Sequence, residues 1–203
     1  AQQHAVEVML YVLEFIAVAS TLGTNSLNIR RSTTISCLTC HQDNVLEDNI
    51  PILSIPIFQN TSASLQKILE CESLPLANAP ICHVCSCRRE SLSKLCFSNL
   101  GSVLIIQLKR FRYVEGSSSK DCSPFQCTPF IEVPTHVEQE ISFVRKFTLI
   151  AVINHTGTLN NGHYTCFVKD GGIWWNCNDK AVVQGSLTML KGALPYILFY
   201  KAI

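Results

Sequence analysis

Apolar and polar residues alternate with two different periods along this chain. Between residues 2–20 the apolar positions recur every three or four residues, which predicts an amphipathic helix, and Gly23 follows as a stop signal. A second, short helix is expected over residues 65–69, with Ser62 or Ser64 as its cap. The rest of the pattern is different and favours strands.

Short runs rich in β-branched and aromatic residues are separated by Gly, Asn and Asp turns, which is typical of an antiparallel sheet. The segment 102–111 is apolar enough to predict a central strand, whereas two prolines make 50–58 an edge strand. The stretch 115–129 is rich in Ser, Gly and Pro and predicts a surface loop. The expected strands are 28–36, 50–58, 91–98, 102–111, 147–154, 163–169, 172–177 and 196–201.

Composition narrows the class of protein. The 203 residues are 47% hydrophobic, enough for a globular core, and a net charge of +1 argues against a nucleic-acid-binding surface. Glu7 and Glu14 interrupt the most apolar segment, which falls short of the ~20 residues of a membrane-spanning helix. Eleven cysteines, an odd number, favour a reducing compartment, so we expect an intracellular protein of the cytoplasm or nucleus.

Four of these cysteines form two CxxC pairs, Cys37 with Cys40 and Cys82 with Cys85. A two-residue spacer lets a tight turn bring both thiolates onto one tetrahedral ion, so the two pairs predict a closed, structural zinc site. The alternatives are a redox dithiol at either pair and a site in which His83 or Cys87 replaces a ligand.

A candidate for proton transfer lies further along the chain. His163 is expected at a turn leading into a strand, from which an imidazole can face a cleft, and histidine is suited to proton transfer near neutral pH. Asn178 and Asp179 end the neighbouring strand. Either side chain could accept the imidazole Nδ1–H and fix its tautomer, as the third member of a catalytic triad does.

Three stretches resemble the ubiquitin-specific proteases. FTLIAVINHTGTLNNGHYTCFVKDGGIWWNCNDKAVV, followed by PYILFYK, is similar to the carboxyl-terminal signature of that family. LIIQLKRF resembles a strand motif that precedes it, with Gln107 where the family commonly has His. QQHAVEV, at the start, is similar to the family's QQDAxEF helix motif, with His4 for Asp and Val8 for Phe.

The resemblance implies an α+β fold, a papain-like cysteine protease palm with an antiparallel sheet and zinc-ribbon-like fingers. Residues 1–27 would be a helical remnant of the thumb, 28–100 the fingers with the CxxC pairs, and 101–203 the palm. By the same resemblance, His163 would be the general base, and Asn178 or Asp179 would orient it. Glu7, Gly162 and Tyr164 match positions that line the channel for the ubiquitin tail.

The family's nucleophilic cysteine lies in an Asn/Gly-rich box upstream of the QQDA motif, and none of the eleven cysteines matches that box. Cys166 and Cys177 are poor substitutes, because neither has the helix N-terminus or cationic neighbour that lowers a thiol pKa. We therefore expect the thumb segment with the nucleophile to be missing and this chain alone to be inactive.

Three functions remain to be weighed. The resemblance favours a thiol-dependent deubiquitinase that hydrolyses the bond after the C-terminal glycine of ubiquitin, acting on ubiquitin or ubiquitinated proteins, with a regulatory protein as a further partner. The alternative is a catalytically inactive ubiquitin-binding or scaffold protein of the same fold. A zinc ribbon that binds nucleic acid ranks last, because the chain lacks clustered Lys and Arg beyond two Arg pairs.

Overall fold

A computed structural model describes residues 27–114, 117–137, 140–158 and 161–203. The helix expected over residues 2–20, and Glu7 with it, lies outside these ranges. No helix within the described ranges is long and apolar enough to cross a membrane.

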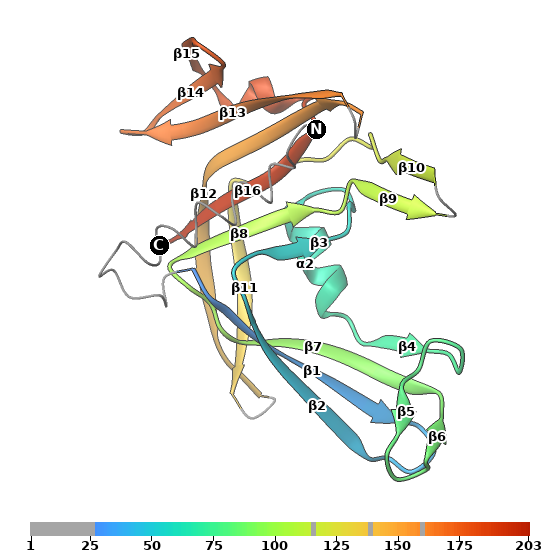
Figure 1. Ribbon diagram of the computed structural model, residues 1–203. Helices are drawn as coiled ribbons and strands as arrows, with labels where there is room; N and C mark the ends of the chain where they lie inside the picture. Colours follow the sequence, from blue (N-terminus) through green and yellow to red (C-terminus); the bar gives the residue numbers. More distant parts are fainter. Residues whose placement is uncertain (1–26, 115–116, 138–139, 159–160) are drawn as a thin grey trace, which may run out of the picture.

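The largest element is an eight-stranded sheet, in the order β15-β14-β13-β12-β16-β8-β3, with β11 paired to β12 (Figure 1). All its pairs are antiparallel except β3 with β8, which is parallel. Its strands are β3 (Leu53–Ile55), β8 (Val103–Leu108), β11 (Phe130–Val137), β12 (Glu140–Gly157), β13 (Gly162–Asp170), β14 (Ile173–Asn178), β15 (Ala181–Gly185) and β16 (Pro195–Ala202).

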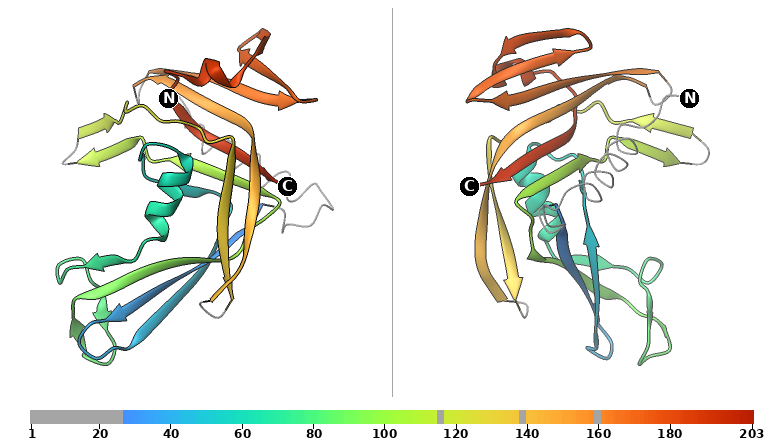
Figure 2. Two further views of the ribbon diagram at one scale, coloured as in Figure 1. Left: turned by 180° about the vertical axis from the view of Figure 1, so that it is seen from behind. Right: turned by 60° about the vertical axis from the view of Figure 1, so that its left-hand side comes forward.

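A separate four-stranded antiparallel sheet, in the order β2-β1-β7-β4, projects away from the larger one, and the small β5–β6 hairpin lies at its far end (Figures 1 and 2). Its strands are β1 (Ile29–Cys37), β2 (Asp43–Ile50), β4 (Glu72–Leu74) and β7 (Ser91–Asn99), and the hairpin is β5 (Ile81–Cys82) and β6 (Cys87–Arg88). One CxxC pair begins at the last residue of β1 and the other at the last residue of β5.

Three shorter elements complete the described fold. A two-stranded hairpin, β9 (Phe111–Val114) with β10 (Ser117–Lys120), extends beyond β8 (Figure 1). The helix α2 (Thr61–Leu69) lies between the two large sheets, and a 3-10 turn, η2 (Leu187–Leu190), precedes β16.

The cap of α2 differs from the sequence prediction. Asn60 is the N-cap, because its Oδ1 accepts a 2.9 Å hydrogen bond from the N–H of Ala63. Ser64 is buried instead, and its hydroxyl donates to the carbonyl of Phe58 and accepts from the N–H of the same residue. Neither Ser62 nor Ser64 therefore caps the helix.

The apolar core explains the positions of the strands. Side chains from β1, β3, β7, β8, β11, β12, β13 and β16 form one buried cluster, joined by Leu65 of α2. A smaller cluster of Ile105, Tyr196 and Ile197 lies on β8 and β16. The central placement predicted for 102–111 is confirmed, because β8 lies between β16 and β3. The prediction of a loop over 115–129 is wrong at its start, where β10 pairs with β9.

Candidate functional site

Two exposed side chains meet at the ends of neighbouring strands. His163 is the second residue of β13, and Asn178 is the last residue of β14. The imidazole Nε2 lies 2.6 Å from the amide Oδ1 of Asn178, which is a short hydrogen bond. The β13–β14 pairing brings together residues that are fifteen positions apart in the sequence.

The nitrogen involved differs from the sequence prediction. An amide oxygen only accepts hydrogen bonds, so the contact with Asn178 places the imidazole proton on Nε2. This leaves Nδ1 as the basic nitrogen of His163, whereas the sequence analysis assigned Nδ1 as the donor. An amide oxygen that accepts a hydrogen bond from one ring nitrogen fixes the tautomer and leaves the other nitrogen free to accept a proton. A general base can therefore be oriented through either Nδ1 or Nε2.

Asp179 lies in a different position from Asn178. It follows β14, is exposed, and has a left-handed backbone with φ 50°, so it begins the tight connection to β15. Asn and Asp tolerate this conformation better than other side chains do. The structure therefore brings Asn178, and not Asp179, into contact with the imidazole.

Gly162 has a steric reason to be glycine. A Cβ at this position would collide with Nε2 of His155 and would lie 2.7 Å from the carbonyl oxygen of Thr156. The His155 side chain, only 2% exposed, occupies the space that a larger residue would need. The close pairing of β12 and β13 just before His163 depends on this gap.

His155 belongs to an aromatic cluster under the site. Its ring centroid lies 4.6 Å from that of Tyr164, 5.5 Å from that of Phe111 and 6.3 Å from that of Tyr196. Tyr164 is half-buried against His155, and this contact positions the residue that follows His163. The cluster gives the start of β13 a rigid support.

Lys120 joins the β9–β10 hairpin to the same support. Its Nζ donates to the carbonyl oxygens of His155, at 2.7 Å, and Gly157, at 2.9 Å. The ammonium group also lies 5.9 Å from the centroid of the Phe111 ring, within range of a cation–π contact. Lys120 therefore satisfies carbonyl groups at the end of β12, next to the turn before His163.

Arg110 fixes the chain on the other side of this hairpin. Its buried guanidinium donates through Nε to the carbonyl of Pro195, at 2.6 Å, and through Nη1 to those of Asp121 and Ser123, at 2.8 and 3.1 Å. Burial lowers the pKa of this guanidinium, although nearby Asp121 opposes the effect. One side chain thus holds three segments of backbone together.

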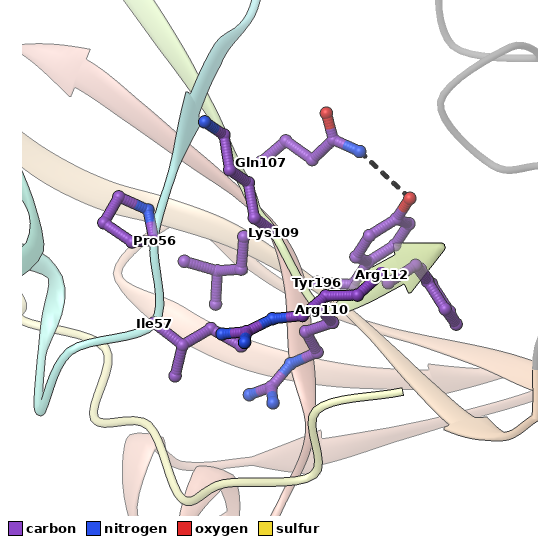
Figure 3. A pocket seen from close by; sticks show the side chains of 9 residues that line it. Pro56, Ile57, Gln107, Lys109, Arg110, Arg112 and Tyr196 are labelled. Atoms are coloured by element: carbon purple, nitrogen blue, oxygen red, sulfur yellow. Dashed lines mark hydrogen bonds between the residues drawn. The ribbon is translucent and has the colours of Figure 1, made fainter. Parts of the chain in front are cut away.

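A cavity of about 350 Å³ opens beside Arg110, between β3 and the end of β8 (Figure 3). Gln107 lies on its rim, where its amide donates to the Tyr196 hydroxyl at 3.0 Å and accepts from the Ser54 hydroxyl at 2.9 Å. Gln107 therefore links β3, β8 and β16. The cavity is lined by Pro56, Ile57, Gln107, Leu108, Lys109, Arg110, Phe111, Arg112 and Tyr196.

The four cysteines of the CxxC pairs come together at the far end of the smaller sheet. The Sγ atoms of Cys37, Cys40, Cys82 and Cys85 all lie within 4.8 Å of one another. Four sulfurs at ~2.3 Å from a common tetrahedral ion would be about 3.8 Å apart, which fits this arrangement. Cys87 lies outside the cluster and donates to the carbonyl of Cys85.

The backbone of each CxxC turn favours a thiolate at the first cysteine. The N–H groups of Cys40 and Thr39 lower the pKa of Cys37 to about 6. The N–H of Cys85 likewise contributes most to a lowered pKa at Cys82. A thiolate is the form of cysteine that binds a metal.

Each CxxC turn is closed by a residue in the left-handed region, His41 with φ 59° and Ser86 with φ 54°. The two turns thus share one backbone shape, although they are more than forty residues apart in the sequence. All eleven cysteines lie in the described part of the chain, and each is a free thiol there.

Sequence reasoning missed the residues that support His163. His155, Lys120 and Arg110 make their contacts with backbone or with rings that are distant in the sequence, so no local spacing reveals them. A signal existed only for His155, because a histidine in an otherwise apolar strand, two residues before a glycine, is unusual.

Comparison with known proteins gives a consistent result. The sequence model of the family described as "Ubiquitin carboxyl-terminal hydrolase" matches residues 1–200. Human ubiquitin carboxyl-terminal hydrolase 17-like protein 10 is 31% identical over 170 residues, a match that covers 82% of this chain and 32% of that protein. The human 17-like protein 6 is also 31% identical, and the match covers 42% of it. The chain thus spans less than half the length of these curated relatives.

Solved structures match over the whole chain. The SAGA Ubp8/Sgf11/Sus1/Sgf73 DUB module bound to ubiquitin aldehyde contains a chain that superposes with a TM-score of 0.84 at 24% identity. The match covers 100% of this chain and 50% of that one. The same module bound to monoubiquitin gives a TM-score of 0.83 at 24% identity and is covered to 49%. At these identities the likeness shows the fold, a ubiquitin-specific protease fold with a cysteine cluster in its smaller sheet.

Proposed function

Because the chain belongs to the ubiquitin carboxyl-terminal hydrolase family, we propose that it is the histidine-bearing part of a cysteine-type deubiquitinase. Its reaction would be hydrolysis of the peptide or isopeptide bond after the C-terminal glycine of ubiquitin. The observation that carries the proposal is the 2.6 Å contact between His163 and Asn178, which fixes the tautomer of an exposed imidazole.

In this proposal His163 takes the proton from a cysteine thiol, and the thiolate attacks the carbonyl carbon of the scissile bond. The imidazolium then gives its proton to the leaving amine, and water hydrolyses the thioester. Asn178 orients the ring, and Asp179 is kept as a second candidate at the adjacent position. The proposed substrate-binding residues are Glu7, Gly162 and Tyr164.

Gly162 and Tyr164 flank the imidazole in sequence, and we place them along the path of the ubiquitin tail. The missing Cβ of Gly162 makes room for the His155 ring, which supports the start of the strand that carries His163. Tyr164 is held by the same histidine ring. Both positions support an extended peptide next to His163.

We propose that the nucleophile comes from chain outside these 203 residues. The sequence spans 32% and 42% of the two relatives compared above, so much of a full-length relative has no counterpart in it. Cys166 and Cys177, the cysteines that are nearest to the site in sequence, are half-buried. Burial raises the pKa of the Cys166 thiol, and this disfavours a thiolate at that position.

We also propose that the four-cysteine cluster binds one structural zinc ion. Cys37, Cys40, Cys82 and Cys85 would fill all four positions of a tetrahedral ion, so no position would remain for substrate. The module around them has few buried apolar residues, since every residue of β2 except Ile50 is exposed. Metal binding would therefore supply stability that packing does not.

Ubiquitin or ubiquitinated proteins are the proposed substrates, and a regulatory protein is a proposed partner. The matched modules are described as bound to ubiquitin aldehyde or monoubiquitin, and each contains further protein chains. An odd number of cysteines, eleven, in a chain with enough apolar residues to fold without disulfides supports the proposal of a reducing, intracellular setting in the cytoplasm or nucleus.

Hydrolysis of a fluorogenic ubiquitin substrate tests whether the nucleophile and His163 lie in different segments of the full-length protein. We expect no turnover by the 203-residue chain and measurable turnover once its natural upstream sequence is added. Turnover by the 203 residues alone would contradict the assignment of the nucleophile to another segment. Absence of turnover in the extended protein would contradict the enzyme proposal.

A second candidate is an inactive ubiquitin-binding protein of the same fold. It is favoured by the departure from the family motif at His4 and by the lack of a cysteine that matches the family's Cys box in these 203 residues. Titration of labelled ubiquitin separates the two functions. If the protein with its upstream sequence binds ubiquitin saturably but does not hydrolyse the substrate, this candidate is supported. Absence of ubiquitin binding would reject it.

A further inference from the structure

Cys166 and Cys177 are free thiols that form a cross-strand pair close to His163 and Asn178 in the chain, on the opposite face of the sheet because side chains alternate along a strand. Cys166 on β13 and Cys177 on β14 are partners in the antiparallel register. Side chains of directly opposed residues lie on the same face of a sheet, with Cβ atoms about 4.5–5.5 Å apart. After burial, the neighbouring Cys177 is the second cause of the raised pKa of Cys166, which agrees with this proximity.

The register of β13 and β14 places the Cα atoms of Cys166 and Cys177 at a distance that allows a disulfide. Gly171 and Gly172, with φ 55° and 87°, form a two-residue hairpin turn, so Asp170 and Ile173 beside it are a hydrogen-bonded pair. Pairs alternate along the ladder, which makes the cysteine pair, four steps away, hydrogen-bonded as well. The Cα atoms of such a pair are about 5.5 Å apart, inside the ~4.4–6.8 Å range of disulfides.

The Cβ atoms of this pair fit a disulfide less well than the Cα atoms do. A disulfide needs Cβ atoms about 3.8 Å apart, so closing the bond would pull the two strands together. Strained or exposed disulfides are more easily reduced and tend to be labile or regulatory. The geometry therefore suits a bond that forms under oxidation and is readily reversed.

We propose that Cys166 and Cys177 are a reversible modification site that forms a disulfide under peroxide and disturbs the His163–Asn178 contact. The Cys177 thiolate attacks hydrogen peroxide and becomes a sulfenic acid, and the hydroxide that is released takes up the proton that the Cys177 thiol had lost and forms water. The second thiol then displaces the sulfenic oxygen as another water molecule and forms the S–S bond. A dithiol reductant returns both thiols and is itself oxidised to its disulfide.

The disturbance follows from the positions of the two cysteines. Cys177 immediately precedes Asn178, and Cys166 lies three residues after His163 on the same strand. The imidazole contact spans the same two strands and is only 2.6 Å long, so a movement of about 1 Å in the strands breaks or reshapes it. Loss of activity on oxidation rests on the proposed function, whereas disulfide formation does not.

Peptide mapping tests the bond itself. The reduced 203-residue chain is treated with hydrogen peroxide in zinc-supplemented buffer, alkylated and digested with trypsin, which cleaves after Lys169 and separates the two cysteines. We expect a linked pair of peptides, lighter by two hydrogens than their sum, in the wild type and in the Cys71→Ser control. The linked pair is absent from Cys177→Ser and, as a second variant, Cys166→Ser.

Recovery of both cysteines in the alkylated or sulfinic form, or linked mainly to other cysteines, would overturn the proposal. The coupling to the site is measured separately, by the long-range ¹H–¹⁵N NMR signals of the His163 ring. We expect peroxide to shift them in the wild type, a dithiol to restore them, and Cys177→Ser to show no shift. Formation of the disulfide without a change at His163 would refute the coupling. Neither measurement uses ubiquitin, so a failure of the proposed deubiquitinase function remains distinguishable.

Discussion

Gly162 contributes to the local shape of the candidate site through the side chain that it lacks. The space left by its missing side chain is filled by the His155 imidazole, which in turn stacks against Tyr164. His163 lies between Gly162 and Tyr164 in the chain, so both its neighbours are held by the same buried ring. At the scale of single residues, the exposed imidazole is positioned by packing beneath it as well as by Asn178.

We expect Gly162→Ala to destabilise the protein by about 1–3 kcal/mol, the usual cost of forcing extra atoms into a packed site. The new Cβ would meet both the His155 ring and the Thr156 backbone, and the backbone oxygen cannot move aside cheaply. Chemical denaturation followed by circular dichroism measures the change in the free energy of unfolding.

Gly171→Asn is the matched control for this substitution. Gly171 has φ 55°, a Cβ added there would have no atom within 4 Å, and asparagine tolerates that backbone conformation. A change within about 0.5 kcal/mol is expected there. Equal destabilisation by the two substitutions would show that the His155 contact is not the cause.

At the scale of elements, the sequence predicted best where one face of a strand is buried. β8 and β16 show an apolar run or a clear alternation, and both were predicted close to their true limits. β2 was missed because most of its residues are polar and all but Ile50 are exposed, so no buried face marks it, and its pairing with β1 makes it a strand. β12 extends far beyond the predicted 147–154 for the same reason, since pairing with β11 continues it.

The candidate site was predictable to a similar degree. The spacing of the CxxC pairs and the resemblance around His163 identified residues whose side chains meet in the structure. The choice between Asn178 and Asp179 was not accessible, because it depends on the turn in which Asp179 adopts a positive φ. The ring nitrogen in the contact depends on side-chain orientation and was predicted wrongly.

The cap of α2 provides a direct test at this scale. We expect Asn60→Ala to cost about 1 kcal/mol, because the N–H of Ala63 loses its acceptor. Ser62→Ala, at an exposed position inside the helix, should change the free energy of unfolding by less than about 0.5 kcal/mol. Thermal or urea denaturation of the two variants side by side measures both effects. The reverse order would restore the capping role that the sequence suggested for Ser62.

The proposed zinc site is tested by metal content. Purified protein should contain one zinc ion per chain, and Cys82→Ser should lose it and melt at a lower temperature. Cys87→Ser is the control, because the Cys87 thiol is close in sequence but lies outside the cluster of four sulfurs and donates to the backbone carbonyl of Cys85. Release of zinc by a chelator, followed with a colorimetric indicator, gives the stoichiometry. Equal zinc loss in both variants, or full retention in Cys82→Ser, would contradict the ligand set.

At the scale of the molecule, a few buried polar links join the larger sheet to α2 and to the chain that follows the β9–β10 hairpin. Arg110 ties the end of β8 to the loop before β11 and to the start of β16. The hydroxyl of Tyr200, also buried, donates to the carbonyl of Thr128 at 2.7 Å, and its oxygen lies 3.1 Å from the hydroxyl of Thr61 of α2, which can donate to it. These links connect parts of the chain that are far apart in sequence, so they should stabilise the described fold as a whole.

We expect Arg110→Met to lower the free energy of unfolding by about 2–4 kcal/mol, because three backbone carbonyls lose their buried donor. Arg112→Met is the control, since Arg112 is 71% exposed and its ion pair with Asp121 is long, at 3.8 Å. Urea denaturation of both variants provides the comparison. A loss that is as large in Arg112→Met would show that general charge, and not the buried network, is responsible.

The central claim is that His163, held by Asn178, is the base of a ubiquitin hydrolase. The most direct measurement is kcat/KM on a fluorogenic ubiquitin substrate for the extended protein and its His163→Gln variant, with ubiquitin affinity measured for both. We predict a loss of at least about 100-fold in kcat/KM, the range for a general base, with unchanged affinity. Turnover by His163→Gln at the rate of the unsubstituted protein would contradict the account.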